Sequence, residues 1–371
     1  MNKFLHIDWI LVGAVFFLSG IGILALYSIS PDAQSGGYAF RQLLFFAMGI
    51  VGLALFASFD YRHVQKYSTP LYLSMLVLLI GVLLWGKTVH GTEGWINLGI
   101  ARFQPVEAAK PILIIFLASF ISKKKTELGE LVRLIVSFVL SSLLIVLVLK
   151  QPDLGSALVL MGIWAGMIFI SGMRFKHFAV MVMIGLCAMG VGWSFLAPYQ
   201  KDRIMTVIEP HTDPQGSGYN VIQATVAVGS GGMFGKGIGH GSQSQLNFLP
   251  EKHTDFIFSV IAEELGLTGA LLVVFLYAVI VYRLNRIALS ARDNFGFLVT
   301  VGVMIMICIQ VTVNIGMNIG LLPVTGIPLP FLSYGGSSLL SMLLSIGLIM
   351  SIFLTKKKHA ILQVSLDRSL L

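Results

Sequence analysis

The sequence predicts an all-α polytopic membrane protein with about ten transmembrane helices. Of its 371 residues, 56% are hydrophobic and only 11% are charged, a balance that a soluble core cannot accommodate. Apolar runs long enough to cross a hydrocarbon core of roughly 30 Å recur along the whole chain. The basic residues lie in short runs beside these segments, which is typical of membrane topology. The formal net charge of +8 therefore indicates no nucleic-acid partner.

The predicted spans follow one another with a single long interruption. We expect them near residues 9–29, 42–59, 69–86, 106–122, 132–149, 154–172, 177–196, 256–281, 297–319 and 338–355. The first span has no small-residue cleavage site, so we expect it to be retained rather than removed as a signal peptide. A polar external loop at about 197–255 separates spans seven and eight, and the chain 1–371 is expected to form one transmembrane domain. The two cysteines, Cys187 and Cys308, fall inside spans and are expected to be packing residues.

The distribution of basic residues predicts the orientation of the chain. An even number of spans places both termini on the same side of the membrane. With the termini inside, 16 of the 25 basic residues fall in cytoplasmic segments and nine fall outside, as the positive-inside rule requires. We therefore expect cytoplasmic termini, and functional residues on the external face, where the unusual residues lie.

The external segment 91–110 carries paired charges at the start of a predicted helix. Pro105 can open a helix, and Glu107 and Lys110 follow at an i,i+3 spacing that lets their side chains face each other. A structural salt bridge would lower the cost of two charges near the bilayer, and contact with a substrate is the alternative. Arg102, just before this helix, is a second candidate for substrate binding.

Two further external segments contain turn residues. In the sequence KQPDLG (150–155), Pro152 and Asp153 favour a tight reversal between two spans, where Asp153 either caps the next helix or takes part in catalysis. The segment 321–338 contains three prolines followed by two glycines. It therefore predicts irregular backbone at membrane depth, which is tolerated only where it is buried in protein or lines a polar cavity.

A run of seven glycines between residues 229 and 241 fits no nucleotide-binding motif. It matches neither the Rossmann fingerprint nor the Walker A pattern. A flexible backbone with Lys236 inside it, and with Lys201 and Arg203 upstream, suits an oxyanion such as a diphosphate. A loop that is merely mobile is the other interpretation.

The strongest catalytic candidate is Asp255, where the long loop enters a predicted span. A carboxylate at that junction costs free energy unless it has a function. The alternative to catalysis is that it caps the helix that begins at Phe256. His253 could tune this carboxylate or simply face water. Glu263 and Glu264 follow about two turns deeper and roughly 100° apart around the helix, so they cannot face one cavity equally well.

Together these segments resemble the SEDS family (shape, elongation, division, sporulation) of bacterial cell-wall polymerases. The resemblance runs from the first span to the last. It rests on the four stretches WINLGIARFQPVEAAK (95–110), QPDLGSAL (151–158), GSGGMFGKGIGHGSQSQLNFLPEKHTDFIFSVIAEELG (229–266) and PVTGIPLPFLSYGGSS (323–338). The wording of the last two stretches is closest to the elongation branch of the family. The departures are small: Val106 stands where a serine is expected, and Ser156 where threonine is common.

The resemblance implies a ten-span fold and a peptidoglycan glycosyltransferase that polymerises lipid II on the outer face of the cytoplasmic membrane. It places Asp255 on the family's essential acidic position, and Glu107 and Lys110 on its paired charges. An α-linked diphosphate that yields a β-linked product requires inversion, with a base on the acceptor side and positive groups at the departing diphosphate. Asp255 is the candidate base. The candidate positive groups are Lys110, Arg102, Arg203 and Lys236.

The resemblance also implies partners: a class B penicillin-binding protein transpeptidase and membrane proteins of the elongation complex. A divalent cation, Mg²⁺ or Mn²⁺, is compatible with a diphosphate substrate, although no cluster of ligands in the sequence defines a site for it. A carrier that flips lipid II is the rival function, because charged and proline-broken spans also mark translocation paths. A structural scaffold is the third, but it leaves the carboxylates in and beside the spans unexplained.

Overall fold

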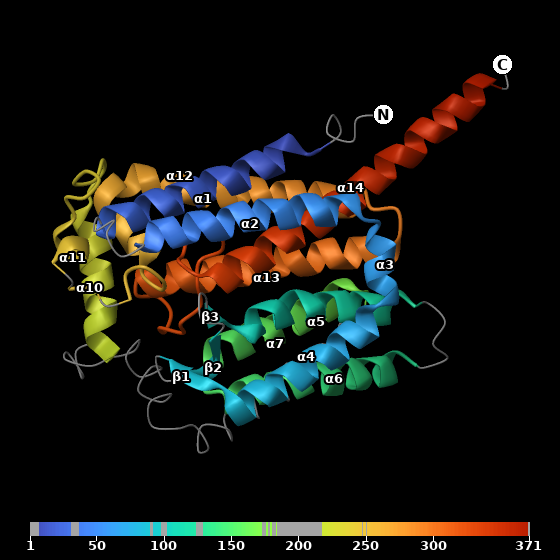
Figure 1. Ribbon diagram of the computed structural model, residues 1–371, viewed down its shortest axis with the longest axis horizontal. Helices are drawn as coiled ribbons and strands as arrows, with labels where there is room; N and C mark the ends of the chain where they lie inside the picture. The colour runs from blue at the N-terminus through green and yellow to red at the C-terminus, as the bar shows by residue number, and fades with distance from the viewer. Residues whose placement is uncertain are drawn as a thin grey trace.

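The chain folds into an elongated bundle of long helices (Figure 1). The computed structural model describes residues 7–30, 37–89, 92–97, 102–123, 129–172, 217–246, 248–249 and 251–369, together with the isolated positions 176, 179 and 183. The start of α1, the short helix α3 and the end of α14 lie at one end of the bundle. Helices α10 and α11 and the β-strands lie at the opposite end.

Long apolar helices make up most of the described chain. They are α1 (Trp9–Ile29), α2 (Tyr38–Ser58), α4 (Ser68–Trp85), α5 (Pro105–Ser122), α6 (Glu130–Lys150), α7 (Leu154–Ile170), α12 (Ile257–Leu289), α13 (Asn294–Asn318) and α14 (Gly336–Ser369). Three shorter helices are α3 (Tyr61–Lys66), α10 (Ser217–Ser230) and α11 (Ser242–Gln245). Helix α13 lies in the middle and packs against α12, α5 and α7.

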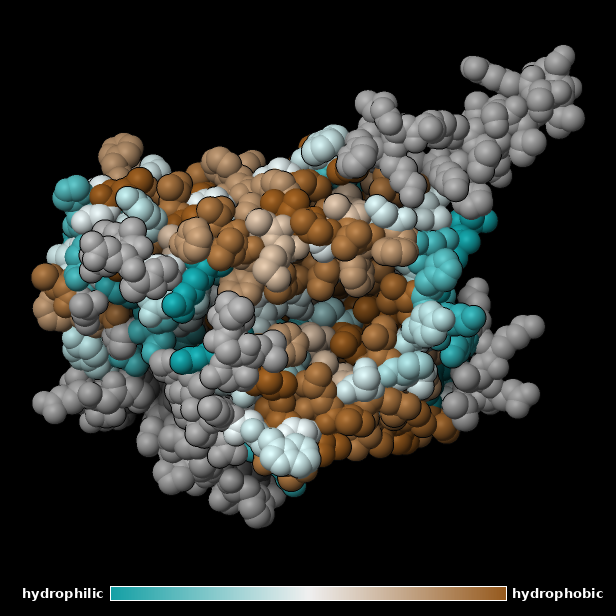
Figure 2. All heavy atoms as spheres, viewed as in Figure 1, coloured by the Kyte–Doolittle hydropathy of each residue, from teal (hydrophilic) through white to brown (hydrophobic). Residues whose placement is uncertain are grey.

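The multi-pass membrane architecture is confirmed. Eight helices within the described ranges are long and apolar enough to cross a membrane, and α7 is a shorter apolar helix. Each coincides with a predicted span, although α12 continues eight residues beyond the predicted end at 281. The predicted span at 177–196 lies outside the described residues, apart from two isolated positions. Hydrophobic side chains form a belt along the bundle, and hydrophilic ones gather toward its two ends (Figure 2).

Aspartate side chains mark the beginnings of several helices. Asp8, Asp60, Asp153 and Asp293 each accept a hydrogen bond from a backbone N–H in the first turn of the helix that follows. Such caps satisfy amide groups that have no partner inside the helix. In an apolar chain they help to fix where α1, α7 and α13 begin.

A small antiparallel sheet, which the sequence did not predict, lies between α4 and α5. Its strands are β1 (Lys87–Val89), β2 (Thr92–Asn97) and β3 (Arg102–Phe103), in the order β1-β2-β3. Ile96 pairs with Phe103, and Asn97 with Arg102. The sheet connects the end of α4 to the helix that carries Glu107 and Lys110.

The proline-rich segment is irregular, as predicted. Between the end of α13 and the start of α14, residues 319–335 form turns and extended backbone rather than helix. Several of their side chains are buried, among them Ile327, Leu329 and Leu332. Much of this irregular stretch is therefore buried in protein, as non-helical backbone at membrane depth requires.

Candidate functional site

Asp255 lies in a tight turn immediately before α12. Its backbone N–H donates to the carbonyl of Glu251 at 3.1 Å. Its carbonyl accepts two hydrogen bonds, from the side-chain amides of Asn314 at 3.1 Å and Asn318 at 3.0 Å. The N-cap position of α12 belongs to Phe256, one residue later, and the Asp255 side chain is partly exposed. The backbone at Asp255 is therefore fixed from two sides.

The two asparagines are site residues that the sequence analysis missed. Asn314 and Asn318 are fully buried in α13, four residues apart and on one face of the helix. Asn314 also donates to the carbonyl of Ile327 at 2.8 Å, and Asn318 accepts from the N–H and hydroxyl of Ser259. The available signal was the pair of amides at i,i+4 in an otherwise apolar span.

The proline-rich segment docks directly onto the turn that contains Asp255. The N–H of Tyr334 donates to the carbonyl of His253 at 2.9 Å, and the hydroxyl of Ser333 donates to the carbonyl of Thr254 at 2.6 Å. A Cβ placed on Gly326 would lie 3.8 Å from Oδ2 of Asp255. The carboxylate therefore stands where two irregular segments meet, beside a glycine.

Glu107 and Lys110 form the predicted ion pair on α5. Lys110 Nζ lies 2.7 Å from Glu107 Oε1, and the two side chains are 1% and 3% exposed. The hydroxyl of Ser341 on α14 donates to the carbonyl of Glu107 at 2.7 Å. The pair is thus buried where α5 and α14 meet, and the predicted geometry is confirmed.

Asp153 caps α7 and also contacts the start of α5. Its Oδ1 accepts from the N–H of Ser156 at 2.9 Å, and its Oδ2 accepts from Nε2 of Gln104 at 3.4 Å. Burial raises the pKa of the Asp153 carboxyl above its ordinary value, although the Ser156 N–H and the positive charge of Lys110 oppose the rise. The capping interpretation is confirmed, and the carboxylate lies in the electrostatic field of the buried ion pair.

The start of α5 is tied to the start of α14. The N–H of Gln104 donates to the hydroxyl of Ser337 at 3.0 Å, and that hydroxyl donates to the carbonyl of Arg102 at 3.4 Å. Arg102 itself is exposed on β3. The structure therefore brings Arg102, the Glu107–Lys110 pair and Asp153 to the end of the bundle that carries Asp255.

Lys236 is held by a carboxylate of α12. Its Nζ lies 2.9 Å from Glu263 Oε1, and the Lys236 side chain is 29% exposed while that of Glu263 is 0% exposed. Glu263 also accepts from the N–H groups of Gln243 and Ser244. Any contact of Lys236 with a diphosphate would therefore compete with Glu263. Arg203, another of the positive groups expected at the diphosphate, lies outside the described residues, as does Lys201.

The glycine-rich run packs closely against α12. A Cβ on Gly231 would approach the carbonyl oxygen of Ala262 to 1.9 Å, and one on Gly235 would approach that of Glu264 to 2.1 Å. Glu264 accepts from the N–H of Gly239 at 3.1 Å and from the hydroxyl of Ser28 at 2.5 Å. Glu263 and Glu264 thus face different partners, as expected from their angular separation.

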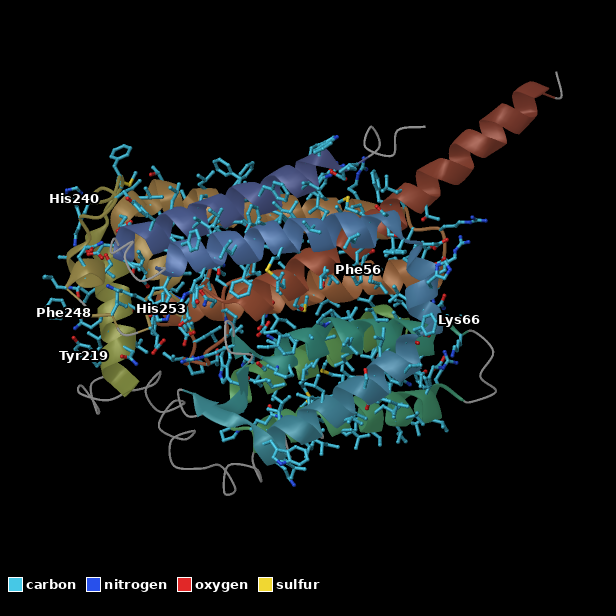
Figure 3. The ribbon with its side chains drawn as sticks, viewed as in Figure 1. Phe56, Lys66, Tyr219, His240, Phe248 and His253 are labelled. Atoms are coloured by element: carbon cyan, nitrogen blue, oxygen red, sulfur yellow. The ribbon has the colours of Figure 1, made fainter. Side chains whose placement is uncertain are left out.

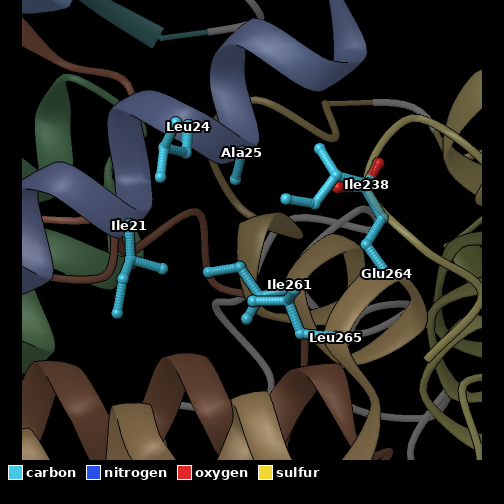
Figure 4. Close-up of a pocket in the computed structure, with 7 residues that line it drawn as sticks. All are labelled: Ile21, Leu24, Ala25, Ile238, Ile261, Glu264 and Leu265. Atoms are coloured by element: carbon cyan, nitrogen blue, oxygen red, sulfur yellow. The ribbon is translucent and has the colours of Figure 1, made fainter. Parts of the chain in front are cut away.

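The structure also contains a small pocket away from Asp255. A pocket between α1 and α12, beneath the glycine-rich run, is lined by apolar side chains and Glu264 (Figure 4). Asp255 does not line it, so it is separate from the candidate site. Among the described residues, no group of three or more His, Cys, Asp or Glu side chains could hold a metal ion.

Comparison of sequences relates the chain to known proteins over nearly its whole length. The family model of the FtsW, RodA and SpoVE proteins, described as cell cycle protein, matches residues 5–358. The chain is 41% identical over 359 residues to stage V sporulation protein E of Bacillus subtilis strain 168, covering 93% of this chain and 96% of that protein. It is 39% identical over 334 residues to the peptidoglycan glycosyltransferase MrdB of Escherichia coli K12, covering 90% of each.

Solved structures share the fold. One solved structure is described as the structural coordination of polymerization and crosslinking by a peptidoglycan synthase complex. Its matching chain has a TM-score of 0.82 and is 31% identical, and the match covers 94% of this chain and 98% of that chain. The crystal structure of the rod shape determining protein RodA of Thermus thermophilus has a TM-score of 0.72 and 30% identity, and the match covers 95% of this chain and 98% of that chain. The similarity extends over almost the entire bundle.

Proposed function

This chain belongs to the SEDS family of FtsW, RodA and SpoVE proteins and is a peptidoglycan glycosyltransferase, and from that premise we propose its substrate, side and catalytic base. It polymerises lipid II on the outer face of the cytoplasmic membrane during cell elongation, by inverting transfer. Asp255 is the general base. The observation that carries the assignment is the fixed position of Asp255 where the turn before α12 meets the proline-rich segment.

The reaction joins C1 of a donor MurNAc to the 4-hydroxyl of an acceptor GlcNAc. As the new C1–O4 bond forms, the bond from C1 to the diphosphate breaks, and the hydroxyl proton passes to the Asp255 carboxylate. A base must be held in place and still reach its substrate. The two buried asparagines support the first requirement, and the partial exposure of Asp255 supports the second.

The departing undecaprenyl diphosphate needs positive charge on the opposite side of the donor sugar. Arg102, Lys110 and Lys236 are our candidates, because all three lie at the same end of the bundle as Asp255. Arg102 is exposed on β3. Lys110 is bound to Glu107 and Lys236 to Glu263, so a contribution from either lysine would require its ion pair to open. No step of the proposal passes through a metal.

The proposed orientation places this site outside the cell and both termini in the cytoplasm. The end of the bundle formed by α3, the start of α1 and the end of α14 is opposite the end that carries α10 and the strands (Figure 1). Basic residues such as Arg62, Lys66 and Arg283 belong to the first end, which is what the positive-inside rule expects of the cytoplasmic side.

A partner is proposed by analogy with the matched complex. The protein with the TM-score of 0.82 comes from a peptidoglycan synthase complex that coordinates polymerization and crosslinking. We propose that this chain likewise works with a class B penicillin-binding protein, which crosslinks the strands, and with other membrane proteins of the elongation complex. Co-purification with that transpeptidase should raise the polymerisation rate, and a rate indifferent to it would count against the pairing.

The experiment that tests the function uses purified protein in detergent with lipid II. A polymerase should produce glycan strands there, because its reaction needs no membrane compartments. A carrier that only flips lipid II has nothing to transport in detergent and should leave the substrate unchanged. Protein that is folded but forms no polymer, alone or with its transpeptidase, would contradict the proposed activity.

A further inference from the structure

Three aromatic side chains from distant segments gather next to Asp255. Tyr38, the first residue of α2, stacks on His253 with ring centroids 4.3 Å apart and an interplanar angle of 15°. Tyr334, from the proline-rich segment, meets Tyr38 edge-on at 4.9 Å and His253 at 5.8 Å. His253 lies at the end of the bundle that carries α10, opposite the end of Lys66 (Figure 3).

This aromatic cluster, Tyr38, His253 and Tyr334, is fixed relative to the candidate base. His253 precedes Asp255 by two residues, and both belong to the turn before α12. The carbonyl of His253 accepts from the N–H of Tyr334 at 2.9 Å. The rings and the carboxylate are therefore carried by the same pair of docked segments.

A buried side chain, Gln42, also joins α2 to the proline-rich segment. Gln42 is 1% exposed, and its side-chain amide donates to the carbonyl of Ser333 at 3.0 Å and accepts from the N–H of Gly335 at 3.2 Å. These two buried hydrogen bonds join α2 to the segment that carries Tyr334. Tyr38, by contrast, is 37% exposed, so stacking on His253 leaves part of its ring open to the outside.

A partly exposed aromatic ring such as that of Tyr38 suits a sugar. A pyranose ring presents a face of C–H groups that packs on an aromatic ring, while its hydroxyls bond to polar groups at the edge. Tyrosine and histidine combine an apolar face with a polar tip. We infer that the aromatic cluster is a stacking platform for a sugar ring of the lipid-linked substrate, and this inference rests on the proposed function. It would bind the sugar ring beside the turn that carries Asp255.

The test compares Tyr38→Leu with Tyr38→Phe in the detergent polymerisation assay. Leucine keeps an apolar side chain but removes the ring face, whereas phenylalanine keeps the face and loses only the hydroxyl. We expect Tyr38→Leu to raise the KM for lipid II by about three- to tenfold, the scale of one aromatic contact, with kcat and Tm retained. Tyr38→Phe should raise KM by less. Tyr27→Leu, at an exposed tyrosine of α1, is the matched control and should keep the wild-type KM.

Any other outcome contradicts the sugar-binding role of the aromatic cluster. An unchanged KM in Tyr38→Leu would show that no sugar uses the ring, and an equal rise in Tyr38→Phe would assign the effect to the hydroxyl. If Tyr38→Leu no longer folds, the ring serves to hold α2. All three results leave the proposed polymerase standing, since the wild-type protein still forms polymer. Absence of polymer from the wild type would instead reject the proposed function itself.

Discussion

The charged residues at the end of the bundle that carries Asp255 differ in how the protein surrounds them. Glu107 and Lys110 are almost fully buried and lie 2.7 Å apart. Asp153 is bound by an amide of its own helix and by Gln104. Asp255 instead keeps a partly exposed side chain on a backbone fixed by Asn314 and Asn318. Position and exposure together are the reasons for which we propose Asp255 as the general base.

At the residue scale, removing one member of the buried ion pair should destabilise the protein. Lys110→Met leaves the Glu107 carboxylate buried and unpaired, which costs about 3–5 kcal/mol. The double variant Glu107→Gln with Lys110→Met should recover much of that loss, because no unpaired charge remains. Thermal unfolding in detergent measures both.

The same variants separate structure from substrate binding. If Lys110 also contacts the diphosphate, the double variant should fold well but polymerise poorly. A single Lys110→Met variant with wild-type Tm would contradict the stabilising role of the pair. A double variant with restored Tm and restored polymerisation would remove Lys110 from the list of substrate contacts.

Asp153 should make stability depend on pH. Because burial raises the pKa of its carboxyl in the folded protein, the folded state binds the proton more tightly than the unfolded state does. The resulting penalty is absent below the unfolded pKa of about 3.9 and grows as pH rises toward the folded value. Asp153→Asn keeps the cap and removes the penalty.

We therefore expect Asp153→Asn to be at least as stable as the wild type at pH 7, and to lose stability relative to the wild type as the pH is lowered. Tm measured for both proteins between about pH 3 and pH 8 checks this, because that range spans the reference value of about 3.9. A Tm difference that does not change with pH, or changes with the opposite sign, would contradict the predicted shift.

At the scale of elements, the glycine-rich run is a docked structure and not only a flexible loop. Its carbonyls at Gly232 and Met233 accept from Leu267 and Thr268 of α12, just after the helix breaks at Gly266, where φ is +68°. The ion pair between Lys236 and Glu263 also joins the run to α12. The run therefore braces the first turns of α12, which begins two residues after Asp255.

Gly235→Ala and Gly239→Ala test this packing as a matched pair. Both glycines have positive φ, +79° and +76°, so both variants carry the strain of a left-handed alanine, about 1–2 kcal/mol. Only at Gly235 would the new Cβ meet a backbone oxygen, that of Glu264 at 2.1 Å, whereas Gly239 has open space. Gly235→Ala should lose about 1–3 kcal/mol more, measured as a lower Tm. Equal losses would show that the run is not closely packed.

The sequence predicts some elements better than others for physical reasons. Long apolar runs define helices such as α5 and α13, because a spanning segment must satisfy its own backbone. The sheet is missed because β1 and β3 have only three and two residues, too few for a periodic pattern. The role of the glycines is missed because close backbone approach depends on which helix lies opposite, and no local pattern records that.

The candidate site likewise has features that the sequence predicts and features that only the tertiary fold reveals. The i,i+3 spacing predicts the Glu107–Lys110 pair, because both residues lie on one helix. The support of Asp255 by Asn314 and Asn318 joins residues about 60 positions apart, so it follows only from the tertiary fold. The same holds for the neighbouring Gly326, which the sequence identifies only as part of a proline-rich turn.

At the scale of the whole molecule, the orientation can be tested by thiol labelling. Ser242→Cys, in a variant without Cys187 and Cys308, places a thiol on the exposed start of α11. An impermeant reagent should label it in intact cells. Lys66→Cys, at the exposed end of α3, is the control for the opposite side and should react only after the membrane is opened. The reverse pattern would overturn the orientation.

The measurement that tests the central claim most directly is the polymerisation rate of Asp255→Asn. Asparagine keeps the size of the side chain and a capping oxygen but cannot accept the hydroxyl proton. If Asp255 is the base, the purified variant should keep the wild-type Tm and partner binding while lipid II polymerisation falls by at least about 10²-fold. If Asp255 only shapes the start of α12, asparagine should substitute well. Polymerisation near the wild-type rate would contradict the assignment.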